Sequence, residues 1–249
     1  MSFVEQRVIG AIIAGIVVAI AFPIGALIAT RIPYSASKRA FFAAFGAGIF
    51  FSAILLLIQQ TLTLGNAYDL VLGFGLGAVT FGLAEHLIKH GGVADSNGRK
   101  KNREGSEGKL AIIGTILDSV PETLFVGILI ALREPGLLAV IIVLFLGNLA
   151  TTLEGAKIMH YQGIGERKIL RDWAADFIIV AVAAPIGYFL AGFALQDILA
   201  IVLGFASGTL IVFIAGELIA RAYRESTGHL EDFSISLGFL VGVIMLFVI

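Results

Sequence analysis

The sequence predicts an all-α membrane protein with eight transmembrane helices in a single domain, residues 1–249. Two observations lead to this fold class. The chain is 58% hydrophobic and only 14% charged, with a mean hydropathy of +0.98, which is far outside the range of soluble domains. A helix also needs roughly 20 apolar residues to cross a bilayer. Stretches of about this length lie at 8–30, 40–62, 68–88, 110–132, 136–157, 174–193, 197–220 and 233–249.

The connections between these stretches are short and leave no room for a separate soluble domain. The longest, about 91–109, is rich in Gly, Ser, Asn and basic residues, which predicts a flexible cytoplasmic loop. A contact with anionic lipid or a partner is the alternative for this loop. The first stretch is too long for a signal-peptide core, and Pro23 is expected to kink it without offering a small-residue cleavage site. We therefore expect it to remain as a helix. The absence of cysteine excludes disulfides and thiolate metal sites.

Basic residues predict the orientation of the chain. All but Arg7 and Arg133 of the 17 Lys and Arg residues fall in alternate connections and their flanks. Because cytoplasmic loops are enriched in Lys and Arg, this distribution predicts that both termini are non-cytoplasmic. We expect an integral protein of a prokaryotic-type plasma (inner) membrane. The net charge of −1 gives no indication of nucleic-acid binding.

Glycine patterns suggest an internal repeat. Residues 44–48 (AFGAG) are similar to 204–208 (GFASG), and residues 72–77 (LGFGLG) are similar to 237–242 (LGFLVG). The matched helices run in opposite directions, which predicts an inverted repeat of helices one to three and six to eight. Transporters of this design bind substrate near the middle of the membrane. The alternative is that small residues recur wherever membrane helices pack closely.

Two carboxylates and a proline interrupt the apolar stretch 110–132. Asp118 and Glu122 lie four positions apart, so they are only about 40° apart around a helix and share one side of it. Pro121, between them, has no N–H to donate and frees a carbonyl one turn back. Ionisable side chains at membrane depth usually face the protein interior or an ion pathway. The pair therefore predicts a bound or transported ion.

Four segments together resemble a known family: 114–123 (GTILDSVPET), 147–152 (GNLATT), 216–223 (GELIARAY) and 237–239 (LGF). They are similar to segments of the ZIP (Zrt/Irt-like) divalent-metal transporters, and the resemblance covers nearly the whole chain. It implies eight helices in a 3+2+3 arrangement, both termini outside, and a homodimer. It also implies transport of a divalent cation (Mn²⁺, Fe²⁺, Mg²⁺ or Zn²⁺) as substrate, with no organic cofactor.

The metal-binding motifs of the family are only partly present. In the helix-four motif His-Asn-x-Pro-Glu-Gly, Asp118 and Ser119 replace the first two residues, whereas Pro121 and Glu122 remain. Of the family's metal-binding motif in helix five, only Asn148 remains at 147–152, and a threonine stands where the family has its glutamate. In helix seven, Ala and Arg at 220–221 stand where Pro-Glu is expected.

The implied ligands are all oxygen atoms. Asp118, Ser119, Glu122, Asn148 and Thr151 form a set that suits Mg²⁺, Mn²⁺ or Fe²⁺ better than Zn²⁺, whose protein sites favour His and Cys. Without a cation the two carboxylates would repel each other and one would keep a proton. Protons are therefore an alternative or coupled substrate.

Three further acidic residues have two interpretations each. Glu154, one turn beyond Thr151, either replaces the lost glutamate or pairs with Lys157. Glu217 either lines a pathway or pairs with the arginine four positions later. Asp176 either lines a cytoplasmic exit or, with the acidic residue at 172, stabilises a helix N-terminus.

These patterns leave two functions open. The first is a ZIP-like transporter that moves divalent cations through an oxygen-lined site at the middle of the membrane. The second is a transport-inactive ZIP-like subunit or scaffold of a membrane complex. An enzyme is not expected, because no Ser/His, His-Glu-x-x-His or paired-aspartate pattern occurs at membrane depth. The expected partners are the lipid bilayer, a second copy and other membrane subunits, without nucleic acid.

Overall fold

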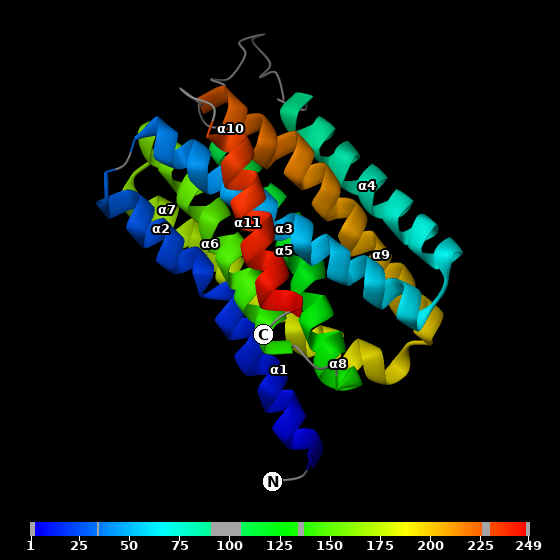
Figure 1. Ribbon diagram of the computed structural model, residues 1–249. Helices are drawn as coiled ribbons and strands as arrows, with labels where there is room; N and C mark the ends of the chain where they lie inside the picture. The colour runs from blue at the N-terminus through cyan, green and yellow to red at the C-terminus, as the bar shows by residue number, and fades with distance from the viewer. Residues whose placement is uncertain (1–2, 34, 91–105, 134–136, 226–229, 248–249) are drawn as a thin grey trace, which may run out of the picture.

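The computed structural model describes residues 3–33, 35–90, 106–133, 137–225 and 230–247 (Figure 1). Side chains at 3–4, 88–90, 106–114, 118, 225 and 247 lie outside this description. Within the described ranges every regular element is a helix, which confirms the all-α class. Most of the predicted loop 91–109 is outside these ranges, but its last residues belong to a helix that begins at Ser106.

Within the described residues, seven helical segments are long and apolar enough to cross a membrane, by length and composition. They match the first seven predicted stretches: Glu5–Arg31, Ala36–Leu64, Ala67–Leu87, Thr115–Leu132, Leu137–Tyr161, Glu166–Phe193 and Gln196–Arg224. The eighth predicted stretch is also helical, as α11 (Glu231–Phe247), with 17 residues in the described range. At 1.5 Å per residue this described part is about 26 Å long, compared with roughly 30 Å for the hydrocarbon core.

Two of the seven segments are broken near a proline. The first consists of α1 (Phe3–Ala19) and α2 (Ala21–Arg31), and the sixth of α7 (Glu166–Ala181) and α8 (Ala183–Phe193). Pro23 and Pro185 lie in the first turn of α2 and α8, where the missing N–H is tolerated. The two breaks also share the sequence Ala-x-Pro-Ile-Gly, at 21–25 and 183–187. They are therefore matched features of the first and sixth segments.

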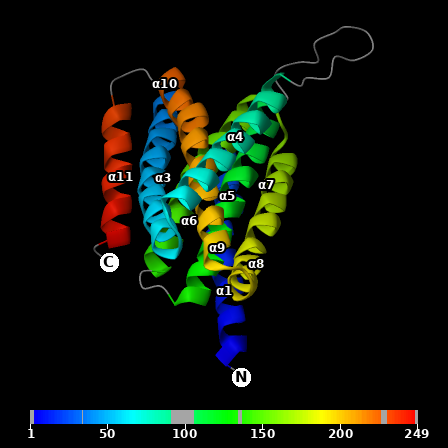
Figure 2. The ribbon, with the colours of Figure 1, turned by 90° about the vertical axis from the view of Figure 1, so that its right-hand side faces the viewer.

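The remaining segments are α3 (Ala36–Leu64), α4 (Ala67–His90), α5 (Ser106–Leu132), α6 (Leu137–Tyr161), and α9 (Gln196–Phe213) with its continuation. That continuation is a π-helical turn, η2 (Ile214–Ile219), followed by α10 (Ala220–Glu225). Pro121 lies inside α5, which runs through it without a break. The start of α1 and the end of α11 lie toward the same end of the molecule (Figure 2).

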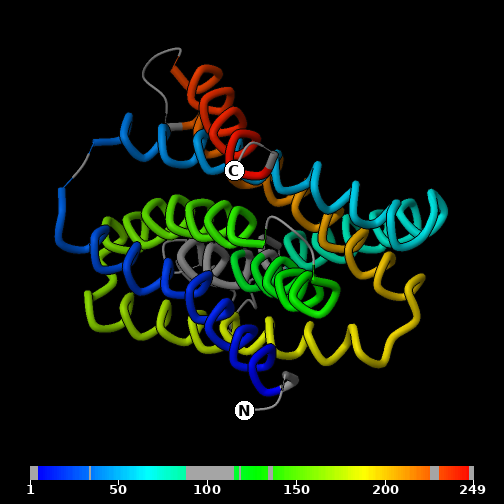
Figure 3. The backbone as a smooth tube through the Cα atoms, turned by 60° about the horizontal axis from the view of Figure 1, so that its bottom comes forward, coloured from blue at the N-terminus to red at the C-terminus, as the bar shows by residue number. Residues whose placement is uncertain are grey.

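The helices pack as two groups. The first group contains α1, α2, α5, α6, α7 and α8, and the second contains α3, α4, α9, η2, α10 and α11. Figure 3 shows the second group along the upper side of the molecule, above the first. The groups are joined most extensively by α3 and α6, which meet as closely as α3 and α9 do within the second group. Contacts of α5 with α9 and α4, and of α11 with α6, also join them.

Glycines allow close helix contacts inside the second group. A Cβ atom at Gly48 of α3 would overlap the backbone carbonyl oxygen of Ile235 in α11, and one at Gly238 would overlap that of Phe45. On the other side of the group, α4 and α9 meet in the same way. There, Cβ atoms at Gly77 and Gly208 would overlap the carbonyl oxygens of Phe205 and Phe74. These glycines belong to the segments that suggested the internal repeat.

The first group contains equivalent contacts. Gly127 of α5 lies against the carbonyl oxygen of Ala184 in α8, and Gly187 of α8 lies against that of Leu124 in α5. Close packing through small residues is the usual way in which membrane helices associate. Aromatic residues fill the spaces that remain, as where the rings of Phe22 and Trp173 stack 6.1 Å apart between α2 and α7.

Candidate functional site

A buried polar contact links α5 and α6 near the middle of both helices. The Ser119 hydroxyl of α5 donates a hydrogen bond of 3.0 Å to Oδ1 of Asn148 in α6. Both side chains are fully buried. The Asn148 Nδ2 atom has no hydrogen-bond partner among the residues that the structure describes. Since buried amide donors are almost always satisfied, this atom marks a place for an additional acceptor. Two predicted ligands from different helices therefore lie side by side.

Glu122 lies close to this contact along α5. It follows Ser119 by three residues, so the two lie within about 60° of each other around the helix. Its side chain is only 1% exposed. A carboxylate in such a place needs a compensating positive charge, a proton or hydrogen bonds. Burial of Glu122 thus agrees with its assignment to a polar site inside the membrane-spanning region.

The other carboxylate of the predicted pair is Asp118. It lies within α5, and its side chain is outside the described part of the chain. The convergence of Asp118 and Glu122 on Asn148 therefore stays a prediction. Pro121 cannot donate to the carbonyl of Leu117, so this turn of α5 keeps one backbone oxygen without its usual helical donor.

The threonines of α6 surround Asn148 without joining α5. Hydroxyls of Thr151 and Thr152 donate to the Asn148 carbonyl at 3.1 and 2.6 Å. A Cβ atom at Gly25 of α2 would lie 2.8 Å from the Thr152 Cβ, so Thr152 packs against α2. The Cγ2 atom of Thr151 lies toward α3 instead. The oxygen of Thr151 keeps lone pairs that can bind a cation, but its hydroxyl hydrogen is used within α6.

Glu154 binds an arginine of the second group. Arg221 of α10 donates from Nη1 to Glu154 Oε2 at 2.7 Å and from Nη2 to Glu217 Oε2 at 2.6 Å. The Glu154 side chain is 1% exposed and that of Arg221 is 14% exposed. The ion pair expected between Glu217 and Arg221 is thus present. Glu154, the predicted replacement for the lost glutamate, also has a fixed positive charge beside it.

Lys157, the alternative partner considered for Glu154, has a role at the end of α2. Its ammonium group donates to the carbonyl oxygens of Ala29 and Ile32 at 2.7 and 2.8 Å. These carbonyls belong to the last turn and C-cap of α2, where helical donors are lacking and the helix dipole is negative. Lys157 therefore satisfies a helix terminus from a neighbouring helix.

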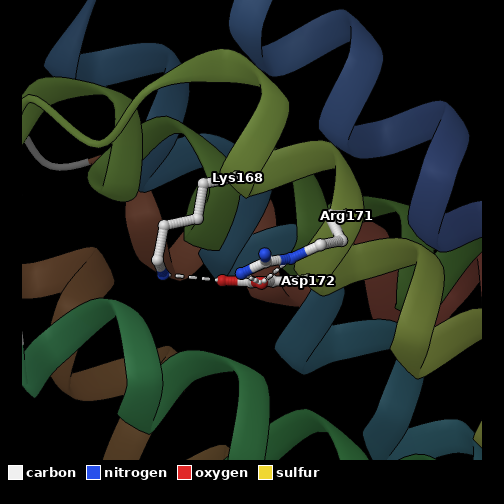
Figure 4. A network of polar contacts seen from close by, with 3 residues as sticks. All are labelled: Lys168, Arg171 and Asp172. Atoms are coloured by element: carbon white, nitrogen blue, oxygen red, sulfur yellow. Dashed lines mark hydrogen bonds and ion pairs between the residues drawn. The ribbon is translucent and has the colours of Figure 1, made fainter.

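The two aspartates of α7 have different surroundings. Asp172 accepts a hydrogen bond of 2.8 Å from the Lys168 ammonium and lies 3.2 Å from Nη2 of Arg171 (Figure 4). Asp176, one turn deeper, is 1% exposed. Neither of its carboxylate oxygens has a hydrogen-bond partner in the described part of the chain, and the same holds for the indole nitrogen of Trp173. Because α7 begins at Glu166, neither aspartate lies in its first turn, and the predicted stabilisation of a helix N-terminus is wrong. Local pairing accounts for Asp172 but not for Asp176.

No family model matches the chain, and no curated protein matches it. Among the described side chains, which exclude Asp118, no three His, Asp or Glu residues are grouped so as to hold a metal ion. The donors that the structure brings together between α5 and α6 are a hydroxyl and an amide, with the Glu122 carboxylate one turn along. These donors are oxygen atoms of the kind that hard cations prefer, and whether they bind a cation stays a prediction.

Sequence reasoning missed two features of this region. The Glu154–Arg221 pair joins residues 67 positions apart, and no local spacing rule predicts it. The contact of Lys157 with Ala29 spans 128 positions. A signal for the first feature was present, since a glutamate within one apolar stretch and an arginine at the end of another each require a partner.

Proposed function

We propose that this protein is a ZIP-like membrane transporter that moves divalent cations through an oxygen-lined site between α5 and α6. The observation that carries the proposal is the buried contact of Ser119 with Asn148, next to the buried Glu122. These residues lie close to the middle of their helices, Ser106–Leu132 and Leu137–Tyr161. Polar and acidic side chains at such depth are expensive in a membrane protein and are typical of substrate pathways.

The chemistry of the site favours a hard cation. Asp118 and Glu122 supply two negative charges, which balance one divalent ion, and Asn148 supplies a neutral oxygen. Oxygen ligands without His or Cys suit Mg²⁺, Mn²⁺ or Fe²⁺ better than Zn²⁺. When the cation leaves, repulsion between the carboxylates favours uptake of a proton by one of them. Proton movement is therefore expected to accompany or replace cation movement.

The proposal includes the architecture of the family. Seven segments cross the membrane in this scheme and α11 completes a set of eight in a 3+2+3 arrangement. The matched breaks at 21–25 and 183–187 support a relation between the first and sixth segments. The glycine contacts of α3 with α11 and of α4 with α9 support the relation between the other repeat members. Both termini would lie outside the cytoplasm, in the plasma membrane, and the protein would be a homodimer.

A flux assay in proteoliposomes tests the transport function. Glu122→Gln keeps the size of the side chain and removes its charge, so we expect divalent-cation uptake to fall at least tenfold. Glu166→Gln is the matched control, because Glu166 lies at the exposed start of α7 and pairs there with Arg31. This control is expected to transport like the unmodified protein. Equal flux in the Glu122→Gln variant and the unmodified protein, for every divalent ion and for protons, would contradict the proposal.

The second candidate function is a transport-inactive subunit or scaffold with the same fold. The specific observation in its favour is the Arg221 guanidinium, which neutralises Glu154 and Glu217 where the family resemblance implies no such charge. A protein of this kind would show no cation or proton flux above empty liposomes, and Glu122→Gln would change nothing. The same assay thus separates the two functions.

A further inference from the structure

The contacts inside the two helix groups differ from those between them. Inside each group, glycines bring backbone against backbone, as at Gly48 and Gly208 in the second group and Gly127 in the first. Glycines also meet side chains inside the groups, as at Gly25 and Gly242, but there they occur beside the backbone contacts. The two described glycines that face the other group have side-chain atoms as their nearest neighbours. A Cβ at Gly46 of α3 would lie 3.2 Å from the Ala150 Cβ, and one at Gly147 of α6 would lie 2.6 Å from the Phe50 ring.

This difference has a mechanical consequence. Where two backbones touch at a glycine, sliding by one residue brings a Cβ atom against a carbonyl oxygen, so the helices are held in register. Side chains can adopt new rotamers, and small sliding movements of packed helices rely on this freedom. Each group is therefore expected to behave as a unit, with the easier rearrangement at the interface between them.

The Glu154–Arg221–Glu217 cluster lies across that interface. Glu154 belongs to α6 of the first group, whereas Arg221 and Glu217 belong to α10 and η2 of the second. The guanidinium binds both carboxylates, at 2.7 and 2.6 Å. Charge-assisted hydrogen bonds of this length are among the stronger ones in proteins. If the groups separate here, Glu154, which is 1% exposed, loses the guanidinium. Removing the positive partner of a buried carboxylate is unfavourable.

The π-helical turn offers a way to release the contact. Single π turns within α-helices are frequent at functional sites. Here η2 (Ile214–Ile219) carries Glu217 and directly precedes α10, whose second residue is Arg221. One residue more or less in a turn rotates all following residues by about 100°. A change of η2 to α-helical geometry would therefore turn Arg221 away from Glu154 without unfolding α10.

We propose that Glu154, Arg221 and Glu217 form a latch that holds the two helix groups together in this conformation and opens when one group moves against the other. Such movement would serve the proposed transport function, on which this part of the inference rests. The latch itself is a property of the described conformation, and it can be measured without any transport.

The natural absence of cysteine makes a distance measurement direct. Spin labels are placed at Lys38→Cys in α3 and Arg167→Cys in α7, two exposed positions in different groups. In reconstituted protein we expect one main distance between them by double electron–electron resonance. In Arg221→Ala we expect a second distance that differs from the first by at least about 5 Å, one helical turn. This distance either accompanies the original one or replaces it. Arg224→Ala, an exposed arginine in α10, is the control and should leave the distance unchanged.

An unchanged distance distribution in Arg221→Ala would overturn the latch. Should this variant fail to fold because two buried carboxylates lose their cation, Glu154→Gln/Glu217→Gln/Arg221→Met removes all three charges at similar volume. A displaced distance in the triple variant supports the latch, and an unchanged distance overturns it. Loss of flux in Glu122→Gln with an unchanged distance in the latch variants would leave the transport proposal intact and overturn the latch alone. A displaced distance in the latch variants, together with no flux in the unmodified protein, would support the latch and overturn the transport proposal.

Discussion

Buried charged side chains in this protein are held by groups on other helices. Lys157 of α6 binds two carbonyl oxygens at the end of α2, and Arg221 of α10 binds Glu154 of α6. Each contact compensates a charge that would otherwise be costly in an apolar interior. Asp176 differs, because its carboxylate has no hydrogen-bond partner within the described residues. Charged residues thus serve as links between helices in at least two places.

Lys157 offers a test of such a link. Lys157→Met keeps the length of the side chain but removes both hydrogen bonds to the end of α2, so we expect a loss of about 1.5–3 kcal/mol in the free energy of unfolding. Lys168→Met is the matched control, since Lys168 is paired with Asp172 at an exposed site, where such a pair contributes about 0–1 kcal/mol. Thermal unfolding in detergent measures both. Equal melting temperatures for the two variants would contradict a stabilising role for Lys157.

At the scale of single helices, prolines and glycines act differently according to their position. Pro23 and Pro185 lie at helix breaks, whereas Pro121 lies inside an unbroken helix beside the candidate site. The sequence predicted the kink at Pro23, and the repeated Ala-x-Pro-Ile-Gly pattern at 183–187 was a signal for the second break. Which glycine touches which neighbour could not be predicted, because it depends on the register between helices far apart in the chain.

Two glycines of α8 allow a matched comparison. Gly187 lies against the carbonyl oxygen of Leu124, so a methyl group there would push α5 and α8 apart. Gly192, in the same helix, has nothing within 4 Å of its Cβ position. Gly187→Ala is expected to destabilise the protein by about 1–3 kcal/mol through overpacking. Gly192→Ala is expected to be neutral or stabilising, because alanine favours helix by about 1 kcal/mol over glycine.

Thermal unfolding of the two alanine variants checks this expectation. A change of 1 kcal/mol corresponds to a shift in melting temperature of about 2–4 °C for a chain of this size. Gly187→Ala should therefore melt several degrees below Gly192→Ala. If Gly187→Ala is as stable as Gly192→Ala, the close contact of α5 with α8 is not essential to the fold.

At the scale of the whole molecule, the sequence predicts membrane spans well and contacts between them poorly. The length of an apolar stretch follows directly from the thickness of the bilayer, and seven of the predicted stretches are, within the described residues, helices long and apolar enough to cross a membrane. Spacing within one helix likewise predicted the pair of Glu217 with Arg221. The link from Arg221 to Glu154, and the packing of Ser119 on Asn148, depend on which helices become neighbours. Hydropathy and local spacing do not contain that information.

The orientation in the membrane is the remaining prediction at this scale. Basic residues gather on alternate connections, which places the connection at Gly163 in the cytoplasm and the one at Asn66 outside. Single cysteines introduced at these two positions can be labelled without background, because the chain has none of its own. In intact cells a membrane-impermeant thiol reagent should label Asn66→Cys and spare Gly163→Cys until the membrane is opened. The reverse pattern would place both termini in the cytoplasm. It would also place the Arg221 end of the molecule on the non-cytoplasmic side of the membrane. Arg221 lies at the end of the seventh segment and Gly163 follows the fifth, and both segments run toward the same side. The result therefore also decides which compartment is nearer to the latch at Glu154.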